Sequence, residues 1–153
     1  MNAKKSNNTL SSFVTTEKTP LAGAGSSRRY YRQSGYANGS LETSSVVVTE
    51  GDNPTENRTF IGLSKFFADR GVNVPRILEV SDDGLCYVQQ DLGDTSLLDV
   101  IRSGDTEKIS STVRKAIDEL IKMQTVNMEE LSREAQQGEF EILPEFDRTA
   151  IQW

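Results

Sequence analysis

Short runs of apolar and β-branched residues alternate with turn-forming residues through the first ninety positions of the chain. Strands are predicted at Arg28–Gln33, Ser45–Thr49, Arg76–Val80 and Leu85–Val88. The dipeptide Asn38-Gly39 predicts a hairpin turn between the first two of them. The three consecutive valines of the second strand indicate burial on both of its faces. Together these patterns predict an antiparallel sheet.

One long helix is predicted within the same region, over Asn57–Arg70. Gly71 stands directly after it, where a C-terminal cap is expected. The apolar residues at helical spacing, which we expect to be core residues, are Phe60, Leu63, Phe66 and Phe67. A sheet with one packed helix places the first part of the chain in the α+β class.

Helical spacing replaces the strand pattern further along the chain. Ser96 and Asp99 resemble a capping box, with Asp in place of the usual Glu or Gln. Apolar residues at helical spacing predict a longer helix over Glu107–Thr125, which Asp105 or Thr106 can cap. A shorter helix is predicted over Met128–Gln137. The second part of the chain is therefore expected to be helical.

Three segments follow from these patterns. Residues 1–19 form a polar tail with a short first element, residues 20–92 form the unit of sheet and helix, and residues 93–153 form the helical part. Near Asp147 a new helix is expected to begin, and the chain stops at Trp153 in the middle of that pattern. We therefore expect a truncated chain.

Charge is distributed unevenly along the sequence. The net charge of −6 gives no electrostatic reason to expect a nucleic acid or an anionic membrane as partner. Residues 1–36 nevertheless carry six basic side chains and one acidic, and such a segment attracts phosphate, although Lys4 and Lys5 are better interpreted as a solvated tail. No apolar run approaches the ~20 residues of a membrane span, and no signal peptide is visible. A cytoplasmic location is the default expectation.

The chain contains one cysteine, Cys86, and no histidine. An intrachain disulfide is therefore excluded, as are the usual zinc ligand sets and any nucleophile activated by histidine. Cys86 lies in an apolar strand, so it is expected to be a small buried hydrophobic residue. Carboxylates remain available as general bases, but their spacing singles out no pair.

A loop of small residues, Gly23–Ser27, leads into a strand that carries Arg28, Arg29 and Arg32. Glycines let a backbone approach phosphate oxygens, and successive N–H groups form an anion-binding nest. The Lys-Ser/Thr of a Walker loop does not follow, and a plain surface turn explains the loop equally well. Alternation places Arg28 and Arg32 on the sheet face opposite Arg29. At least one of the three is expected to be solvated.

A polar stretch, Gln89–Thr95, separates the last predicted strand from the helix that begins near Ser96. A strand that stops at a linker leaves backbone N–H and C=O groups unpaired, and these can bind a planar heterocycle such as adenine. Taken alone, the segment is also explained by an ordinary connection between a strand and a helix.

Four blocks of sequence together resemble the aminoglycoside phosphotransferase/choline kinase-like family: LAGAGSSRRYYR, ADRGVNVPRIL, VQQDLGDTSL and PEFDR. They stand in the family's order over roughly Pro20–Trp153, with particular likeness to the bacterial cell-wall kinases that phosphorylate the anomeric position of N-acetylmuramate or N-acetylglucosamine. The resemblance implies a protein-kinase-like N-lobe, a hinge and the first helices of a truncated C-lobe. It implies an ATP-dependent phosphotransferase, with magnesium and a small-molecule hydroxyl acceptor in the intact enzyme.

The resemblance also implies which residues bind the adenine nucleotide. The glycine-containing loop would lie over the phosphates, and the backbone of the hinge would recognise adenine. The implied residues are Gly23, Ala24, Gly25, Ser26, Ser27, Arg28, Val47, Gln90, Asp91 and Leu92.

The chain departs from the family pattern in two ways. The strand Ser45–Glu50 has no lysine to hold the phosphates; Thr49 stands near the expected place, and an arginine of Arg28–Arg32 is the hypothetical substitute. The family's His-Gly-Asp loop, its later Asn and its metal-binding Asp are absent. We therefore expect no catalytic residue and no metal ligand in this chain, which should be inactive alone. Its uncovered helix faces should promote self-association.

Two other functions fit the same residues. A naturally short kinase-like protein would sense a nucleotide or pair with another subunit, without catalysis. A structural α+β domain would resemble kinases by accident. An H-G-D-x-x-x-x-N block in the reading frame after Trp153 would favour the enzyme, and a genuine stop there would favour the non-catalytic module.

Overall fold

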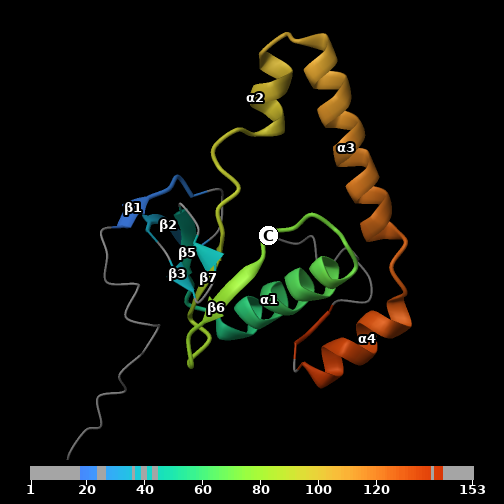
Figure 1. Ribbon diagram of the computed structural model, residues 1–153. Coiled ribbons are helices and arrows are strands. Elements are labelled where there is room, and N and C mark those ends of the chain that lie inside the picture. The colour runs from blue at the N-terminus through green and yellow to red at the C-terminus, as the bar shows by residue number, and fades with distance from the viewer. Residues whose placement is uncertain are drawn as a thin grey trace, which may run out of the picture.

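The computed structural model describes residues 18–23, 27–35, 37–38, 41–42, 45–138 and 140–142. Within these ranges the fold is α+β, with a five-stranded antiparallel sheet, a two-stranded hairpin and four helices (Figure 1). The predicted tail up to residue 17 and the helical start expected near Asp147 lie outside the described residues.

The sheet has the strand order β1-β2-β5-β7-β6, and all of its neighbouring strands are antiparallel. Its strands are β1 (Lys18–Pro20), β2 (Arg29–Ser34), β5 (Ser45–Glu50), β6 (Ile77–Val80) and β7 (Cys86–Gln90). The four strands expected from the sequence are thus confirmed, with ends shifted by one or two residues. The separate pair β3 (Ala37–Asn38) and β4 (Leu41–Glu42) confirms the hairpin predicted at Asn38-Gly39.

The last strand, β7, is longer than predicted. Gln89 and Gln90 were expected to break the strand, but both belong to it. Gln89 pairs with Val47 of β5 and with Ile77 of β6, and Gln90 pairs with Val46. The prediction was wrong because ladder hydrogen bonds to neighbours on both sides hold polar residues in a strand whose own sequence does not favour it.

Each face of the sheet has its own set of contacts. On one face, Val46 and Val48 of β5 pack with Cys86 and Val88 of β7, and all four are buried. On the other face Tyr87 meets Phe60 of the helix α1 (Pro54–Asp69), with ring centroids 5.5 Å apart. The burial of β5 on both faces is thereby confirmed, since Val47 is buried on the side of α1.

The helix α1 begins earlier than predicted because Pro54 stops the preceding strand and also suits the first turn of a helix, where its missing N–H costs nothing. The side chain of Asn53 caps it by accepting hydrogen bonds from the backbone N–H groups of Thr55 and Glu56, both at 3.1 Å. Gly71 follows with a φ of 74°, as expected of a residue that ends a helix.

The remaining helices are α2 (Leu97–Arg102), α3 (Thr106–Gln124) and α4 (Met128–Gln137). The capping box of α2 is confirmed, since Asp99 accepts from the Ser96 N–H at 2.8 Å and Ser96 Oγ accepts from the Asp99 N–H at 3.2 Å. In Figure 1, α2 and α3 form an arch that stands away from the sheet. The helix α3 buries none of its residues.

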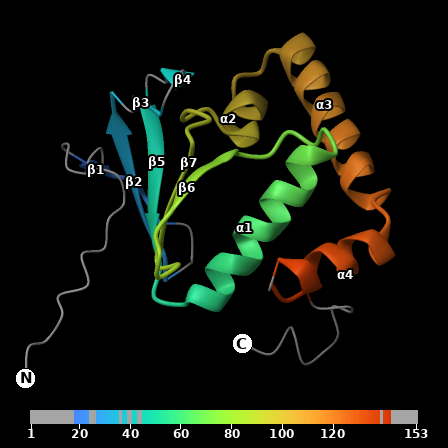
Figure 2. The same cartoon turned by 60° about the horizontal axis from the view of Figure 1, so that its bottom comes forward.

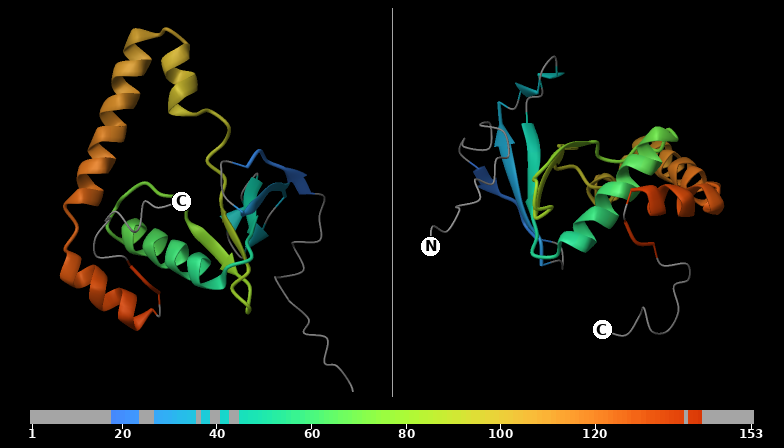
Figure 3. Two further views of the ribbon diagram at one scale, coloured as in Figure 1. Left: turned by 180° about the vertical axis from the view of Figure 1, so that it is seen from behind. Right: turned by 90° about the horizontal axis from the view of Figure 1, so that it is seen from below.

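The helix α4 lies on the side of α1 that faces away from the sheet (Figures 2 and 3). Arg70 at the end of α1 joins the two helices, because its Nη2 lies 2.6 Å from Glu134 and 3.2 Å from Glu130 of α4. The Arg70 guanidinium also stacks 3.5 Å from the ring centroid of Phe66. The helix α1 is thus packed between the sheet and α4.

Candidate functional site

The predicted site residues come from three places in the fold. Gly23, Ser27 and Arg28 belong to the connection between β1 and β2, Val47 belongs to β5, and Gln90, Asp91 and Leu92 end β7 and begin the linker to α2. Ala24, Gly25 and Ser26 lie outside the described residues.

The side chains of β2, β5 and β7 that face α1 form one surface of the sheet. Val47 pairs with Arg32 of β2 on one side and with Gln89 of β7 on the other. Directly opposed residues of antiparallel strands share a face, so Val47, Arg32 and Gln89 lie on the same side of the sheet. Asp91 continues this side beyond the end of β7, where it contacts Arg32.

The linker after β7 differs in its backbone from the strand before it. The N–H of Gln90 donates to the Arg76 carbonyl at 2.8 Å and is therefore occupied. The backbone groups of Leu92 have no hydrogen-bond partner among the described residues, and this residue is 64% exposed. The linker then turns at Gly93, whose φ is 82°. Among the hinge residues, the N–H of Gln90 is thus occupied, whereas the N–H of Leu92 is open to a ligand.

A cluster of charged groups ties this linker to the sheet. Nε of Arg32 lies 2.6 Å from Oδ2 of Asp91, and Nη2 of Arg32 lies 3.0 Å from Oδ1, so the contact is bidentate. Ser45 Oγ donates to Asp91 Oδ2 at 2.6 Å, and the Gly93 N–H donates to Oδ1 at 2.9 Å. Chiefly the Arg32 guanidinium, aided by these donors, holds the pKa of Asp91 well below its usual range. Asp94 adds a second carboxylate 2.8 Å from Arg32.

The sequence patterns did not reveal this cluster. The sequence pattern indicates Arg32 only as one of three strand arginines, and it predicts a role only for the backbone of Asp91. Alternation already placed the Arg32 side chain on one face of its strand, but its partner lies 59 positions away in the sequence. Because the two residues are so far apart in the chain, no local sequence pattern indicates that they are in contact.

The three arginines of this region have different partners. Arg28 faces α1, where its Nε donates to Asn57 Oδ1 at 3.1 Å and its Nη2 lies 2.8 Å from Glu56. Arg29 lies 3.6 Å from Glu50 with its side chain 74% exposed, which agrees with the expectation that one arginine is solvated. Arg32 is held in the cluster with Asp91. Arg28 is therefore the arginine next to the glycine-containing loop.

Gly23, the first residue of that loop, and Arg28, the residue directly after it, line the same cavity of about 220 Å³, together with Leu21, Arg29 and Tyr30 among others. At the place where the family pattern has a lysine, Thr49 is fully buried and pairs with Tyr87. The strand β5 therefore offers no cation to this cavity, whose lining includes the cations Arg28 and Arg29, and the side chain of Arg28 is the more buried of the two.

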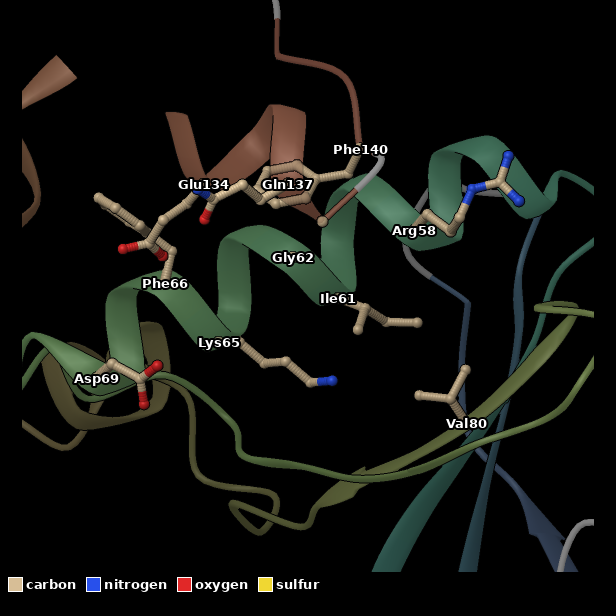
Figure 4. Close-up of a pocket in the computed structure, with 11 residues that line it drawn as sticks. Arg58, Ile61, Gly62, Lys65, Phe66, Asp69, Val80, Glu134, Gln137 and Phe140 are labelled. Atoms are coloured by element: carbon tan, nitrogen blue, oxygen red, sulfur yellow. The ribbon is translucent and has the colours of Figure 1, made fainter. Parts of the chain in front are cut away.

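A larger cavity of about 650 Å³ lies between α1 and α4 and shares no residue with the predicted site. Figure 4 shows Lys65 and Ile61 of α1 pointing away from Phe140 and Gln137, on the side of the helix where Val80 of β6 lies. The ring of Phe140 covers Gly62, where an added Cβ would overlap it (Figure 4). The sequence patterns gave no indication of this cavity, because it arises from the docking of α4 on α1.

Comparison with known proteins relates the chain to a sugar kinase. The N-acetylmuramate/N-acetylglucosamine kinase of Pseudomonas aeruginosa is 32% identical to it over 113 residues, which make up 73% of this chain and 31% of that kinase. The chain thus spans about a third of the length of this curated relative. No family model and no solved structure matches the chain.

This similarity agrees with the phosphotransferase class that the sequence blocks implied, at the level of a kinase relationship. It does not extend to the aminoglycoside phosphotransferase family as a whole. Two further findings concern only the part of the chain that the structure describes. Within it, no helix combines the length and apolar character that a membrane crossing needs, and no group of three metal-ligating side chains is present.

Proposed function

We propose that this chain is the nucleotide-binding part of an ATP-dependent phosphotransferase that acts on a sugar hydroxyl. The observation that carries the proposal is the similarity to the amino-sugar kinase of Pseudomonas aeruginosa. The fold is consistent with a kinase-like N-lobe: an antiparallel sheet, one long helix inserted between β5 and β6, and an exposed linker that leads into helices. The α2–α3 arch would then begin the second lobe.

The proposed nucleotide lies along the edge formed by the linker and the cavity beside Arg28. Adenine would bind the backbone of Asp91 and Leu92, because the Leu92 N–H is open while the Gln90 N–H is occupied. Val47 would form an apolar wall, and the phosphates would lie toward Gly23–Ser27 and Arg28. Two observations support the fit of ATP: an exposed unpartnered amide at one end and a cavity with an arginine at the other.

In this proposal, the groups that orient the acceptor hydroxyl and hold magnesium belong to the intact enzyme and not to this chain. ATP supplies the phosphoryl group when bound, and a carboxylate that orients the acceptor hydroxyl is required in addition. The chain has no histidine, so the His-Gly-Asp segment of the resembled family is absent from it. We therefore propose that the chain alone binds nucleotide without transferring phosphate, and that magnesium is held in the intact enzyme.

The exposed apolar side of the arch supports a role as part of a larger protein. Leu120 and Ile121 of α3 are 51% and 52% exposed, and Leu98 of α2 is 50% exposed. We propose that the two thirds of the kinase length that this chain does not span would cover this side. In the isolated chain the same surface would promote self-association.

Titration of the 153-residue chain with magnesium and ATP, followed by calorimetry, tests the proposal. We expect saturable binding of ATP and ADP, and no phosphorylation of N-acetylmuramate or N-acetylglucosamine. Inosine triphosphate is the matched control, because it replaces the amino group of adenine with a carbonyl that a backbone acceptor cannot bind. Its affinity should be about tenfold lower, the cost of one mismatched hydrogen bond. Absence of ATP binding, or equal affinity for both nucleotides, would contradict the proposed site.

A further inference from the structure

Two of the partners of Arg28 lie on α1: one is buried and neutral, and the other is exposed and charged. Asn57 is 1% exposed, and its Oδ1 accepts a hydrogen bond from Nε of Arg28 at 3.1 Å. Glu56, with its side chain 51% exposed, lies 2.8 Å from Nη2 of Arg28. A neutral amide orients a guanidinium without neutralising it, whereas an exposed carboxylate forms an ion pair that is weak and easily exchanged.

Asn57 is itself held rigidly. Its Nδ2 donates to the Gly84 carbonyl at 2.9 Å, which fixes the direction in which Oδ1 points. Gly51 lies against the same amide, since a Cβ built at Gly51 would be 3.0 Å from both Nδ2 and Oδ1. The amide is therefore enclosed between two turns of backbone, and Arg28 is attached to a fixed point on α1.

The aromatic ring of Phe60, one turn further along α1, also contacts Arg28, with the guanidinium carbon 5.4 Å from the ring centroid. The Arg28 side chain is only 12% exposed, so its position is well defined. It lines the 220 Å³ cavity that also contains Gly23, at the far end of the loop proposed to lie over the phosphates. An anion bound in that cavity, beside Gly23, would lie next to Arg28.

We propose that Arg28 binds the nucleotide phosphates in place of the missing strand lysine, that Asn57 is the residue that positions it, and that Glu56 competes with the phosphates for the same guanidinium. This inference rests on the proposed function. Glu56 then lowers the affinity for polyphosphate, because its carboxylate neutralises the arginine and repels a phosphate bound beside it. Asn57 keeps Arg28 in place while its charged partner is exchanged.

Nucleotide affinity in charge variants tests each part of the inference. Glu56→Gln removes the competing charge at an exposed position and should tighten ATP binding about two- to fivefold, the worth of an exposed ion pair. Arg28→Gln should weaken ATP binding by at least about tenfold, since a hydrogen bond to a charged group is lost. Asn57→Asp retains an acceptor near Nε but adds a negative charge, and it should weaken ATP binding as well. Adenosine affinity should stay unchanged in all three.

Arg133→Gln is the matched control, because it removes the same charge from an exposed residue of α4 that does not line the cavity beside Arg28; ATP affinity should stay within about twofold of the unsubstituted chain. Tighter ATP binding by Glu56→Gln cannot result from loss of structure, so it decides the question even if Arg28→Gln or Asn57→Asp fails to fold. Unchanged or weaker ATP binding by Glu56→Gln would overturn the inference while leaving the proposed function intact. If the unsubstituted chain binds no ATP, the proposed function itself fails.

Discussion

The carboxylate of Asp91 receives both Nε and Nη2 of Arg32, at 2.6 and 3.0 Å, and this pair fastens the linker after β7 to the second strand of the sheet. The Asp91 side chain is only 6% exposed, and Ser45 donates a further hydrogen bond to it. A linker proposed to bind adenine through its backbone has to keep that backbone in one conformation. The ion pair provides this constraint from the side chain.

Asp91→Asn should destabilise the protein at neutral pH, because the amide cannot replace a carboxylate between two donors and a guanidinium. The pKa of Asp91 is lower in the folded protein than the value of about 3.9 in an unfolded chain. Its stabilising effect is therefore complete above that unfolded value and declines as the pH falls from there toward the folded pKa. The urea midpoints of the two proteins should differ at pH 7 and converge as the pH is lowered below 4.

Asp94→Asn is the control for this experiment. Asp94 also contacts Arg32, at 2.8 Å, but its side chain is 79% exposed. Its removal should shift the urea midpoint less than the removal of Asp91, because exposed ion pairs contribute little. An equal shift in both variants at pH 7 would show that Asp91 has no special role in holding the linker.

Leu92→Pro should abolish ATP binding, since proline has no N–H to offer to adenine. Leu92→Ala retains the N–H and should bind ATP with nearly the affinity of the unsubstituted chain. Gln90→Ala should also have little effect, because the Gln90 side chain is exposed and its N–H is engaged by Arg76. Calorimetric titration measures all three. Equal losses in Gln90→Ala and Leu92→Pro would place the adenine contact elsewhere.

Gly62→Ala should change the free energy of unfolding in opposite directions in the unsubstituted protein and in the Phe140→Ala variant. In the unsubstituted protein the new methyl group overlaps the ring of Phe140 and should lower the free energy of unfolding by about 1–2 kcal/mol. When Phe140→Ala has removed the ring, the same change should raise the free energy of unfolding by up to about 1 kcal/mol, because alanine favours a helix more than glycine does. Urea denaturation of the four proteins gives both values as a double-mutant cycle. If Gly62→Ala changed the free energy of unfolding in the same direction in both proteins, the ring of Phe140 would not pack against α1.

The thiol of Cys86 should react slowly in the folded protein. Burial raises its pKa to about 11, so the thiolate that attacks a disulfide reagent is scarce at pH 8. Reaction with Ellman's reagent should be at least about 100-fold slower than in concentrated urea, where the thiol has its ordinary pKa near 8.5. The measurement is unambiguous because the chain has one cysteine. A fast reaction without urea would show that β7 opens readily.

Features with a local physical cause were visible in the amino-acid sequence. The capping box of Ser96 and Asp99, the end of α1 at Gly71 and the hairpin at Asn38 follow from residues within a few positions of one another. The burial of Cys86 follows from the apolar strand around it. Such features depend on backbone propensity and short-range hydrogen bonds, which the sequence specifies directly.

Features with distant partners required the tertiary structure. The sequence placed three arginines near a small-residue loop, but only the packing of α1 directs Arg28 to Asn57, and only the end of β7 brings Asp91 to Arg32. The strand β7 extends through Gln90 because its neighbours supply ladder partners. The cavity over α1 exists because α4 docks there. The sequence alone determined which elements form, and the tertiary structure decided which side chains meet, because contacts between residues far apart in the chain form only when the elements pack.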